Sequence, residues 1–257
     1  MGVLFVGEQL QPFLEVKELK KSFGHIEALK GASLQAKCGE VLAIVGDNGA
    51  GKSTLIKTLS GALTPDAGSI IVDGKEYGHL TPKLAGDNGI STVYQDLSLV
   101  NTQTVWENIF LGHEYRNFGW LNKKKMRREA AELLNNLNIS IHNHEEIVGN
   151  LSGGQRQAIA VARAIHHGGK MIILDEPTAA MGLRETAATQ QLIKNLAVQG
   201  YGVIIISHNI QQVFELSDRI CVMRQGQVLA LVDTKSVTSD DIVSMIVSGT
   251  SLNGAIQ

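Results

Sequence analysis

A glycine-rich loop between a short apolar run and a helical pattern is the feature that most constrains this chain. Residues 46–54, GDNGAGKST, follow EVLAIV and lead into KSTLIKTLSGAL. They match G-x-x-x-x-G-K-[ST], in which glycines let backbone N–H groups curl around phosphate oxygens. A helix starting near Lys52 would also point its positive dipole end at that anion. The alternative, a strand-to-helix turn that binds nothing, is disfavoured by this context. The predicted nucleotide-binding residues are Gly46, Asp47, Asn48, Gly49, Ala50, Gly51, Lys52, Ser53 and Thr54.

An acidic pair stands at the end of a second apolar run, KMIILDEP, at residues 170–177. An acidic pair in such a place is commonly a helix cap or half of a salt bridge. A phosphate-binding loop needs a carboxylate for its magnesium and a residue that polarises the attacking water. We therefore expect Asp175 to act on Mg²⁺ together with Ser53, and Glu176 to act as the catalytic base.

The remaining pattern predicts an α/β fold. Strand-like runs cover residues 13–19, 26–36, 40–46, 69–75, 89–95, 170–176, 201–208 and 218–232. The later runs are nearly continuous in Ile and Val, as in strands buried on both faces of a mostly parallel sheet. Helical patterns cover residues 52–63, 123–137, 185–199 and 210–216, and residues 96–165 are mostly helical in pattern.

The pentapeptide LSGGQ, residues 151–155, opens another helical run. Ser152 can cap that helix, and Gly153 and Gly154 leave backbone donors bare beside Gln155. Together with the two preceding motifs, in this order, the chain resembles the ATP-binding cassette (ABC) ATPases over residues 13–249. The resemblance implies a P-loop NTPase core, an N-terminal antiparallel β subdomain and an inserted helical subdomain. Within one cassette of residues 1–257, the helical subdomain would span 96–165, and the core with the β subdomain would span 13–95 and 166–257.

The resemblance also implies roles for three single residues. Phe23 would stack on adenine, with an ordinary strand residue packed in the core as the alternative. Gln95 would touch Mg²⁺ and the attacking water and link the core to the helical lobe, with a polar strand end as the alternative. His208 would contact the γ-phosphate as a catalytic switch residue, whereas a lone histidine after a buried strand is more often a structural hydrogen-bonding group. The implied cofactors are ATP and Mg²⁺.

One position departs from the common family pattern. Many members carry an aspartate shortly after the acidic pair, in a loop that crosses a dimer interface. Here the segment is DEPTAAMGL, and Gly182 stands at that position. The sugar importers of the ribose, xylose and fructose type have a similar loop, and GDNGAGKST, TVYQ and ISHN also resemble that subgroup. The subgroup implies import of a monosaccharide, and Gly182 weakens any transfer of the aspartate's role.

The resemblance implies partners as well. In this family the Lys52 loop of one subunit and the Ser152 segment of another enclose each ATP, so the chain is expected to form a dimer with itself. Membrane-spanning permease subunits and, indirectly, a substrate-binding protein would complete an importer at the cytoplasmic face of the membrane. Two alternatives stay open: a soluble cassette ATPase acting in DNA repair or translation, and a regulatory subunit that binds ATP without turnover.

Composition bears on nucleic-acid binding, on the redox compartment and on membrane-spanning segments. A net charge of −2 and a pI of about 6.4 argue against nucleic-acid binding through global charge. Two distant cysteines, Cys38 and Cys221, fit a reducing compartment and give no disulfide framework. The longest apolar runs are strand-sized, so we expect no membrane-spanning segment and no signal peptide.

Three further segments carry weaker expectations. HNHEE, residues 142–146, could suggest a metal cluster, but a solvated loop is the preferred interpretation. KKKMRR, residues 123–128, is expected to be the wet face of its helix, with contact to lipid head groups or a partner as the alternative. The segment 96–104, with Leu97, Leu99 and Val100 as exposed anchors, and residues 118–121 are expected to dock a cytoplasmic helix of the membrane subunit.

Overall fold

The structure is a computed structural model that describes residues 11–117, 119–141, 143–179 and 181–249. Parts of the expectations above fall on Phe118, His142 and Ala180, and on the two ends of the chain, 1–10 and 250–257. Those parts lie outside the described residues.

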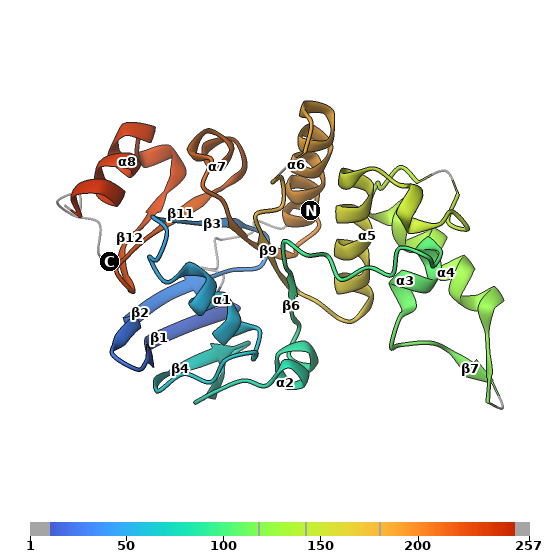
Figure 1. Ribbon diagram of the computed structural model, residues 1–257, viewed down its shortest axis with the longest axis horizontal. Coiled ribbons are helices and arrows are strands. Elements are labelled where there is room, and N and C mark those ends of the chain that lie inside the picture. The colour runs from blue at the N-terminus through green and yellow to red at the C-terminus, as the bar shows by residue number, and fades with distance from the viewer. Residues whose placement is uncertain (1–10, 118, 142, 180, 250–257) are drawn as a thin grey trace, which may run out of the picture.

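A six-stranded sheet forms the centre of the molecule (Figure 1). Five of its strands are parallel, and β12 pairs antiparallel with β11 at one edge. In spatial order the strands are β12 (Gln227–Asp233), β11 (Arg219–Arg224), β3 (Val41–Val45), β10 (Gly202–Ile206), β9 (Met171–Asp175) and β6 (Ile90–Val93). The predicted run 218–232 is therefore two strands, which turn at Gln225 and Gly226, both with positive φ.

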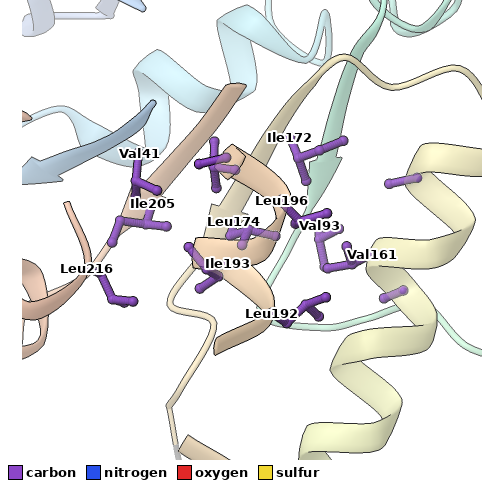
Figure 2. Packing of buried hydrophobic residues seen from close by; sticks show 14 of the residues in the cluster. Val41, Val93, Val161, Ile172, Leu174, Leu192, Ile193, Leu196, Ile205 and Leu216 are labelled. Atoms are coloured by element: carbon purple, nitrogen blue, oxygen red, sulfur yellow. The ribbon is translucent and has the colours of Figure 1, made fainter. Parts of the chain in front are cut away.

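Alternation along the central strands divides the interior into two hydrophobic clusters. Strand β3 sends Val41, Ala43 and Val45 into one cluster and Leu42 and Ile44 into the other. Side chains of consecutive strand residues point to opposite faces, so a strand that is apolar throughout is covered on both sides. Figure 2 shows the first cluster, where strand and helix side chains meet: Val41, Val93, Val161, Ile172, Leu174, Leu192, Ile193, Leu196, Ile205 and Leu216.

A four-stranded antiparallel sheet shares the second cluster with the helix that follows the glycine-rich loop. Its strands, in spatial order, are β2 (Ile26–Ala36), β1 (Leu14–Phe23), β4 (Ala67–Val72) and β5 (Lys75–Tyr77). The predicted strand 69–75 was wrong as a single element, because Asp73 and Gly74 have positive φ and turn the chain into the β4–β5 hairpin. Helices α1 (Lys52–Leu59) and α2 (Pro82–Asp87) lie on this side.

The remaining helices cover the other face of the six-stranded sheet or extend from it (Figure 1). They are α3 (Val105–Phe110), α4 (Lys123–Asn136), α5 (Gly153–His166), α6 (Leu183–Val198), α7 (Ile210–Leu216) and α8 (Ser239–Ser248), with short 3-10 turns at Val148–Asn150 and Thr234–Ser236. In the described residues, no helix is long and apolar enough to cross a membrane.

Residues 96–165 contain helices α3, α4 and α5, as their pattern predicts, and also a two-stranded hairpin, β7 (Arg116–Asn117) and β8 (Trp120–Leu121). The hairpin was not expected, because strands of two residues are too short to show an alternating pattern. The helices contribute to the same hydrophobic cluster as the central sheet. The boundaries of a separate helical subdomain therefore stay a prediction.

The central sheet should dominate the stability of the fold. We expect Ile205→Ala to lower the free energy of unfolding by about 2–5 kcal/mol, because it leaves a cavity beside a strand covered on both faces. Val198→Ala is the matched control, since Val198 is 88% exposed at the end of α6 and its truncation should change stability by less than about 0.5 kcal/mol. Urea unfolding followed by circular dichroism measures both, and equal effects would contradict this account.

Candidate nucleotide-binding site

The predicted site residues converge because their strands end at one edge of the parallel sheet. Ile206 pairs in register with Ile44 on one side and with Asp175 on the other. The chain leaves β3 into the glycine-rich loop, β9 into Glu176 and β10 into His208. Ligand sites of open α/β sheets lie outside the carboxyl ends of the strands. Strand pairing thus brings together motifs that lie more than a hundred residues apart in the chain.

The glycines of the loop serve two different purposes. A Cβ atom at Gly46 would collide with the backbone oxygen of Met223, and one at Gly51 would lie 2.6 Å from that of Ala28. Gly49 has open space around it, but its φ of +83° favours glycine. The close approach of neighbouring backbone therefore requires glycine at two of the three positions. The sequence pattern had predicted that the approach of phosphate requires all three glycines.

Lys52 is the first residue of α1, and its ammonium group turns back over the loop. Its Nζ donates hydrogen bonds to the backbone oxygens of Gly46 at 2.7 Å and Asp47 at 2.9 Å. Burial lowers the pKa of Lys52, while the carboxylates of Glu176, Asp47 and Asp175 act in the opposite direction. The next residues, Ser53 and Thr54, lie in the first turn of α1.

The pKa of Asp175 is shifted in the opposite direction to that of Lys52, and in both residues burial disfavours the charged form. Burial raises the pKa of the Asp175 carboxyl, the neighbouring Glu176 raises it further, and Lys52 opposes both. Two carboxylates and one partly buried ammonium thus meet at the carboxyl edge of the sheet. A divalent cation coordinated by oxygen ligands would relieve the repulsion between the carboxylates.

Glu176 contacts His208 directly. The distance from His208 Nδ1 to Glu176 Oε1 is 3.1 Å, and the His208 side chain is largely exposed. Glu176 has a φ of +50°, uncommon for a residue with a side chain, and its N–H donates to the oxygen of Ile206. Asp47 and Asn48 share with His208 a cleft of about 330 Å³. The structure thus brings Glu176, His208 and the glycine-rich loop together.

Gln95 follows strand β6 and lies in a second cleft, of about 330 Å³, that Glu176 and Gly153 also line. The loop after Gln95 is tied to α5, because the Arg163 guanidinium donates to the oxygens of Leu97 at 2.7 Å and Ser98 at 2.8 Å. Burial of the Arg163 guanidinium lowers its pKa from the ordinary arginine value. A shift of α5 would therefore move the loop that carries Gln95.

The LSGGQ segment forms a capped helix start, as predicted. The Ser152 hydroxyl accepts from the Gln155 N–H at 3.3 Å, and Gln155 Oε1 accepts from the Ser152 N–H at 3.1 Å. The Glu185 carboxylate of α6 accepts from Gly153 N at 3.2 Å and from Gly182 N at 3.3 Å. Glu185 thus joins the start of α5 to the start of α6, beside a cleft of about 520 Å³ that Ser152, Gly154 and Gln155 line.

The LSGGQ segment and Phe23 are the two remaining predicted parts of the site. Figure 1 shows α1 and α5 on opposite sides of strand β6, and none of the described clefts is lined both by residues 46–54 and by Ser152. Phe23 ends β1 in the β1–β2 hairpin and is 50% exposed. The interpretation of Phe23 as a packed core residue was therefore wrong.

The structure corrects the expected docking anchors. Leu97 and Leu99 pack against the hydrophobic cluster of the sheet and helices, and Val100 is half-buried, so none is an exposed anchor. Loop residues can carry apolar side chains inward as readily as outward, which the sequence alone does not distinguish. On α4, by contrast, Met126 is buried and its cationic neighbours are exposed, which fits both the predicted wet face and its alternative, contact with lipid head groups or a partner. Among the residues that the structure describes, no group of histidine, cysteine and acidic side chains could hold a metal; His142 lies outside them, so the interpretation of residues 142–146 stays a prediction.

Sequence comparison decides the family. The profile of the ABC transporter family matches residues 29–179. The xylose/arabinose import ATP-binding protein XylG of Sulfolobus acidocaldarius is 44% identical over 239 residues, which cover 93% of this chain and 95% of that protein. This chain belongs to the ABC transporter family. It is an ABC transporter ATPase, as the order of its motifs implies.

Further comparisons agree with this assignment. The fructose import ATP-binding protein FrcA of Rhizobium meliloti is 41% identical, over 92% of this cassette and 94% of that protein. A nucleotide-free ATP-binding cassette from an ABC transporter superposes with a TM-score of 0.80 at 28% identity, over 93% of this chain and 96% of that one. A dimeric post-hydrolysis cassette bound to ADP and Pi gives 0.72 at 28% identity, over 86% and 98%. The predicted ABC fold, with its antiparallel β subdomain, is confirmed.

Two site residues of the cassette escaped the sequence reasoning. Glu185 stands three residues after Gly182, a spacing typical of a helix N-terminus, so a capping pattern could have indicated it. Arg163 gave no signal, because its partners are backbone oxygens 65 and 66 residues earlier in the chain.

The raised pKa of Asp175 predicts a pH-dependent cost to the nucleotide-free cassette. As pH rises above the ordinary aspartate value of 3.8, the unfolded chain loses this proton first, so folding stability falls until the higher folded-state pKa is passed. Asp175→Asn removes this loss. We expect the variant to be more stable than wild type near pH 7, with a gap that shrinks toward pH 4.

Urea unfolding in EDTA at several pH values measures this gap. Asp233→Asn is the matched control, since it makes the same change at an exposed position at the end of the edge strand β12. A gap that is absent at pH 7, or constant with pH, would contradict the assignment of a buried, repelled carboxylate.

Proposed function

We propose that this cassette hydrolyses ATP to drive monosaccharide uptake through separate membrane-spanning subunits. The observation that carries the proposal is the assembly of Lys52, Asp175, Glu176 and His208 at one edge of the sheet. The sugar is suggested by the relatives, which are named for xylose, arabinose and fructose import and align over more than nine-tenths of their length.

The residues present suit ATP and Mg²⁺. The glycine-rich loop offers backbone donors and Lys52 to phosphate, and the exposed ring of Phe23 is available to adenine. Mg²⁺ prefers oxygen ligands, which the Ser53 hydroxyl, the Gln95 amide and the Asp175 carboxylate supply. When bound, the ion would neutralise phosphate charge during transfer. The raised pKa of Asp175 is what a partly buried carboxylate without a strong cationic partner should show.

Glu176 and His208 then divide the work of hydrolysis. The Glu176 carboxylate would orient the attacking water and accept its proton. His208 would hold the glutamate through the contact at 3.1 Å and contact the γ-phosphate of bound ATP. Gln95 reaches the same region from the neighbouring cleft. The loop that carries Gln95 moves with α5 through Arg163, so hydrolysis and helix position are linked.

A second copy of the chain would complete each site. The Ser152, Gly153, Gly154 and Gln155 segment lies on the far side of β6 from the glycine-rich loop of its own chain, and a related cassette is dimeric with ADP and Pi. Closure of two copies around ATP would bring each segment to its partner's nucleotide. Within each copy, we propose residues 96–165 as the helical subdomain, which moves against 13–95 and 166–257.

The permease subunits would dock in a groove of about 720 Å³ between α2, β6 and the second half of α5. Tyr94, next to Gln95, lines this groove together with Arg163, which holds the loop after Gln95. Lys83, Asp87 and Tyr94 offer polar contacts around its apolar floor. This groove replaces the segment 96–104 as the proposed contact, at the cytoplasmic face of the membrane, with a substrate-binding protein acting indirectly.

Glu176→Gln tests the catalytic assignment. It keeps the size of the side chain but removes its charge, so ATP should still bind while hydrolysis falls about 10²–10⁴-fold. Unhydrolysed ATP should hold two chains together, and a dimer should appear on size-exclusion chromatography with ATP and Mg²⁺ but not with ADP. Hydrolysis at the wild-type rate would overturn the role of Glu176.

Ser152→Arg in the Glu176→Gln background is the control for shared-site geometry. The arginine places bulk at the start of α5, where the partner's nucleotide would sit, so the ATP-dependent dimer should be lost while ATP binding persists. A dimer that survives this substitution would contradict the proposed arrangement of two chains.

Ala62→Glu tests the docking groove. Ala62 is exposed and lines the groove, so a carboxylate there should reduce sugar uptake and co-purification of the permease at least about tenfold, while basal ATPase stays unchanged. Ala67→Glu adds the same charge at an exposed position outside the groove and should leave uptake intact. Normal uptake by Ala62→Glu would exclude this groove.

A further inference from the structure

The β7–β8 hairpin exposes two large apolar side chains that the proposed function does not use. Trp120 is 82% exposed and Leu121 is 45% exposed. The chain's other tryptophan, Trp106, is 3% exposed, and its ring faces the guanidinium of Arg127. A large exposed indole on a protruding hairpin costs solvation free energy unless something covers it. Its amphipathic ring suits the boundary between water and lipid.

The residues around this hairpin carry a strong positive charge. Residues 114–128 contain six cations and one acid. Three of the cations are engaged within the chain: Lys125 with Glu129, Arg127 with Glu145 and Arg128 with Glu132. The other three stand nearest the hairpin in sequence and, among the described residues, form no ion pair within 4 Å. These are Arg116, Lys123 and Lys124.

The placement of the lysines is unfavourable within the protein itself. Lys123 and Lys124 begin α4, whose first turn contains no acidic residue, so their charges oppose the helix dipole. Glu107 and Glu114 act on Lys123 and Arg116 from a distance, but each carboxylate accepts backbone N–H groups, of Thr104 and Gly112 respectively. The three cations therefore remain available to an external anion.

The hairpin also lies on a suitable side of the molecule. In Figure 1 it projects at the lower right, along the same lower edge as α2, which borders the proposed permease groove. His113, three residues before β7, lines that groove as well. The side of the cassette that carries both the proposed permease groove and the hairpin would face the membrane.

We infer that Trp120, Leu121, Arg116, Lys123 and Lys124 form a membrane-contact patch for anionic lipid head groups. The apolar pair enters the head-group region, and the three cations neutralise phosphates around it. The inference rests on the proposed function in one respect, because an importer subunit is located at a membrane. The patch would hold the helical segment against the bilayer, independently of nucleotide.

Tryptophan fluorescence of the full chain tests the patch, because Trp120 is exposed and Trp106 is buried. With vesicles containing phosphatidylglycerol, emission should shift to shorter wavelength, and the protein should co-sediment in a way that weakens with salt. With pure phosphatidylcholine vesicles, neither change is expected. Trp120→Phe should abolish the shift and retain most of the co-sedimentation.

Charge and apolar variants separate the two contributions. Lys123→Gln with Lys124→Gln should weaken vesicle binding about 30-fold, since each cation near an anionic surface is worth about fivefold. Trp120→Ala should weaken it at least about tenfold. Lys194→Gln with Lys235→Gln, and Val198→Ala, alter exposed residues elsewhere and should bind like wild type. All of these variants should keep the basal ATPase rate.

Three outcomes would overturn the inference. They are equal binding to both vesicle types, wild-type binding by the Lys123/Lys124 variant, and no vesicle binding by the wild-type protein. If the wild-type protein binds no vesicles and the hairpin variants also lose the co-purifying permease, the hairpin belongs to a contact with a protein partner. Because ATPase is measured on the same preparations, absence of vesicle binding with normal hydrolysis rejects the patch alone. Vesicle binding without ATPase activity would reject the proposed function and keep the patch.

Discussion

The site depends on the close approach of three backbone segments around the glycine-rich loop. Gly46 lies against the oxygen of Met223, and Gly51 against that of Ala28, where no side chain fits. The turn at Gly226 closes the arrangement, since its N–H donates to Ala50 and its oxygen accepts from Lys30. The loop is thereby fixed to both the parallel and the antiparallel sheet. Phosphate would meet a preformed cradle, because its shape is set by packing of the protein on itself.

The same edge of the sheet holds an electrostatic conflict that folding alone does not resolve. Burial raises the pKa of Asp175 and lowers that of Lys52, so both groups are less stable in their charged forms than they are in water. Structural sites usually avoid such conflicts, whereas sites for charged ligands retain them. Phosphate and magnesium are charges of the kind that would relieve the conflict, so ligand binding and folding stability are linked at this edge.

Helix α5 connects the parts that a second subunit and the membrane subunits would contact. Its N-terminus carries Ser152 and is joined to α6 by Glu185, while Arg163 on its second half holds the loop after Gln95. Helix α5 thus links the proposed dimer face, the candidate catalytic residues and the proposed docking groove. A displacement of α5 at one of these regions would displace the other two directly, because the helix itself connects them.

The sequence by itself determined the local elements and the chemistry of the motifs. Nearly continuous apolar runs predicted the central strands, and glycine, lysine and acidic residues at fixed spacing predicted the phosphate loop and its acids, because both signals are local. It did not reveal the hairpin that exposes Trp120, the inward turn of Leu97, or the roles of Arg163 and Glu185. Those features depend on contacts between distant segments, such as Arg163 with the oxygen of Leu97 or Glu185 with Gly153. Only the tertiary structure showed which contacts bring Glu176, His208 and the glycine-rich loop to one edge of the sheet, because strand order and helix packing place side chains that no spacing along the chain relates.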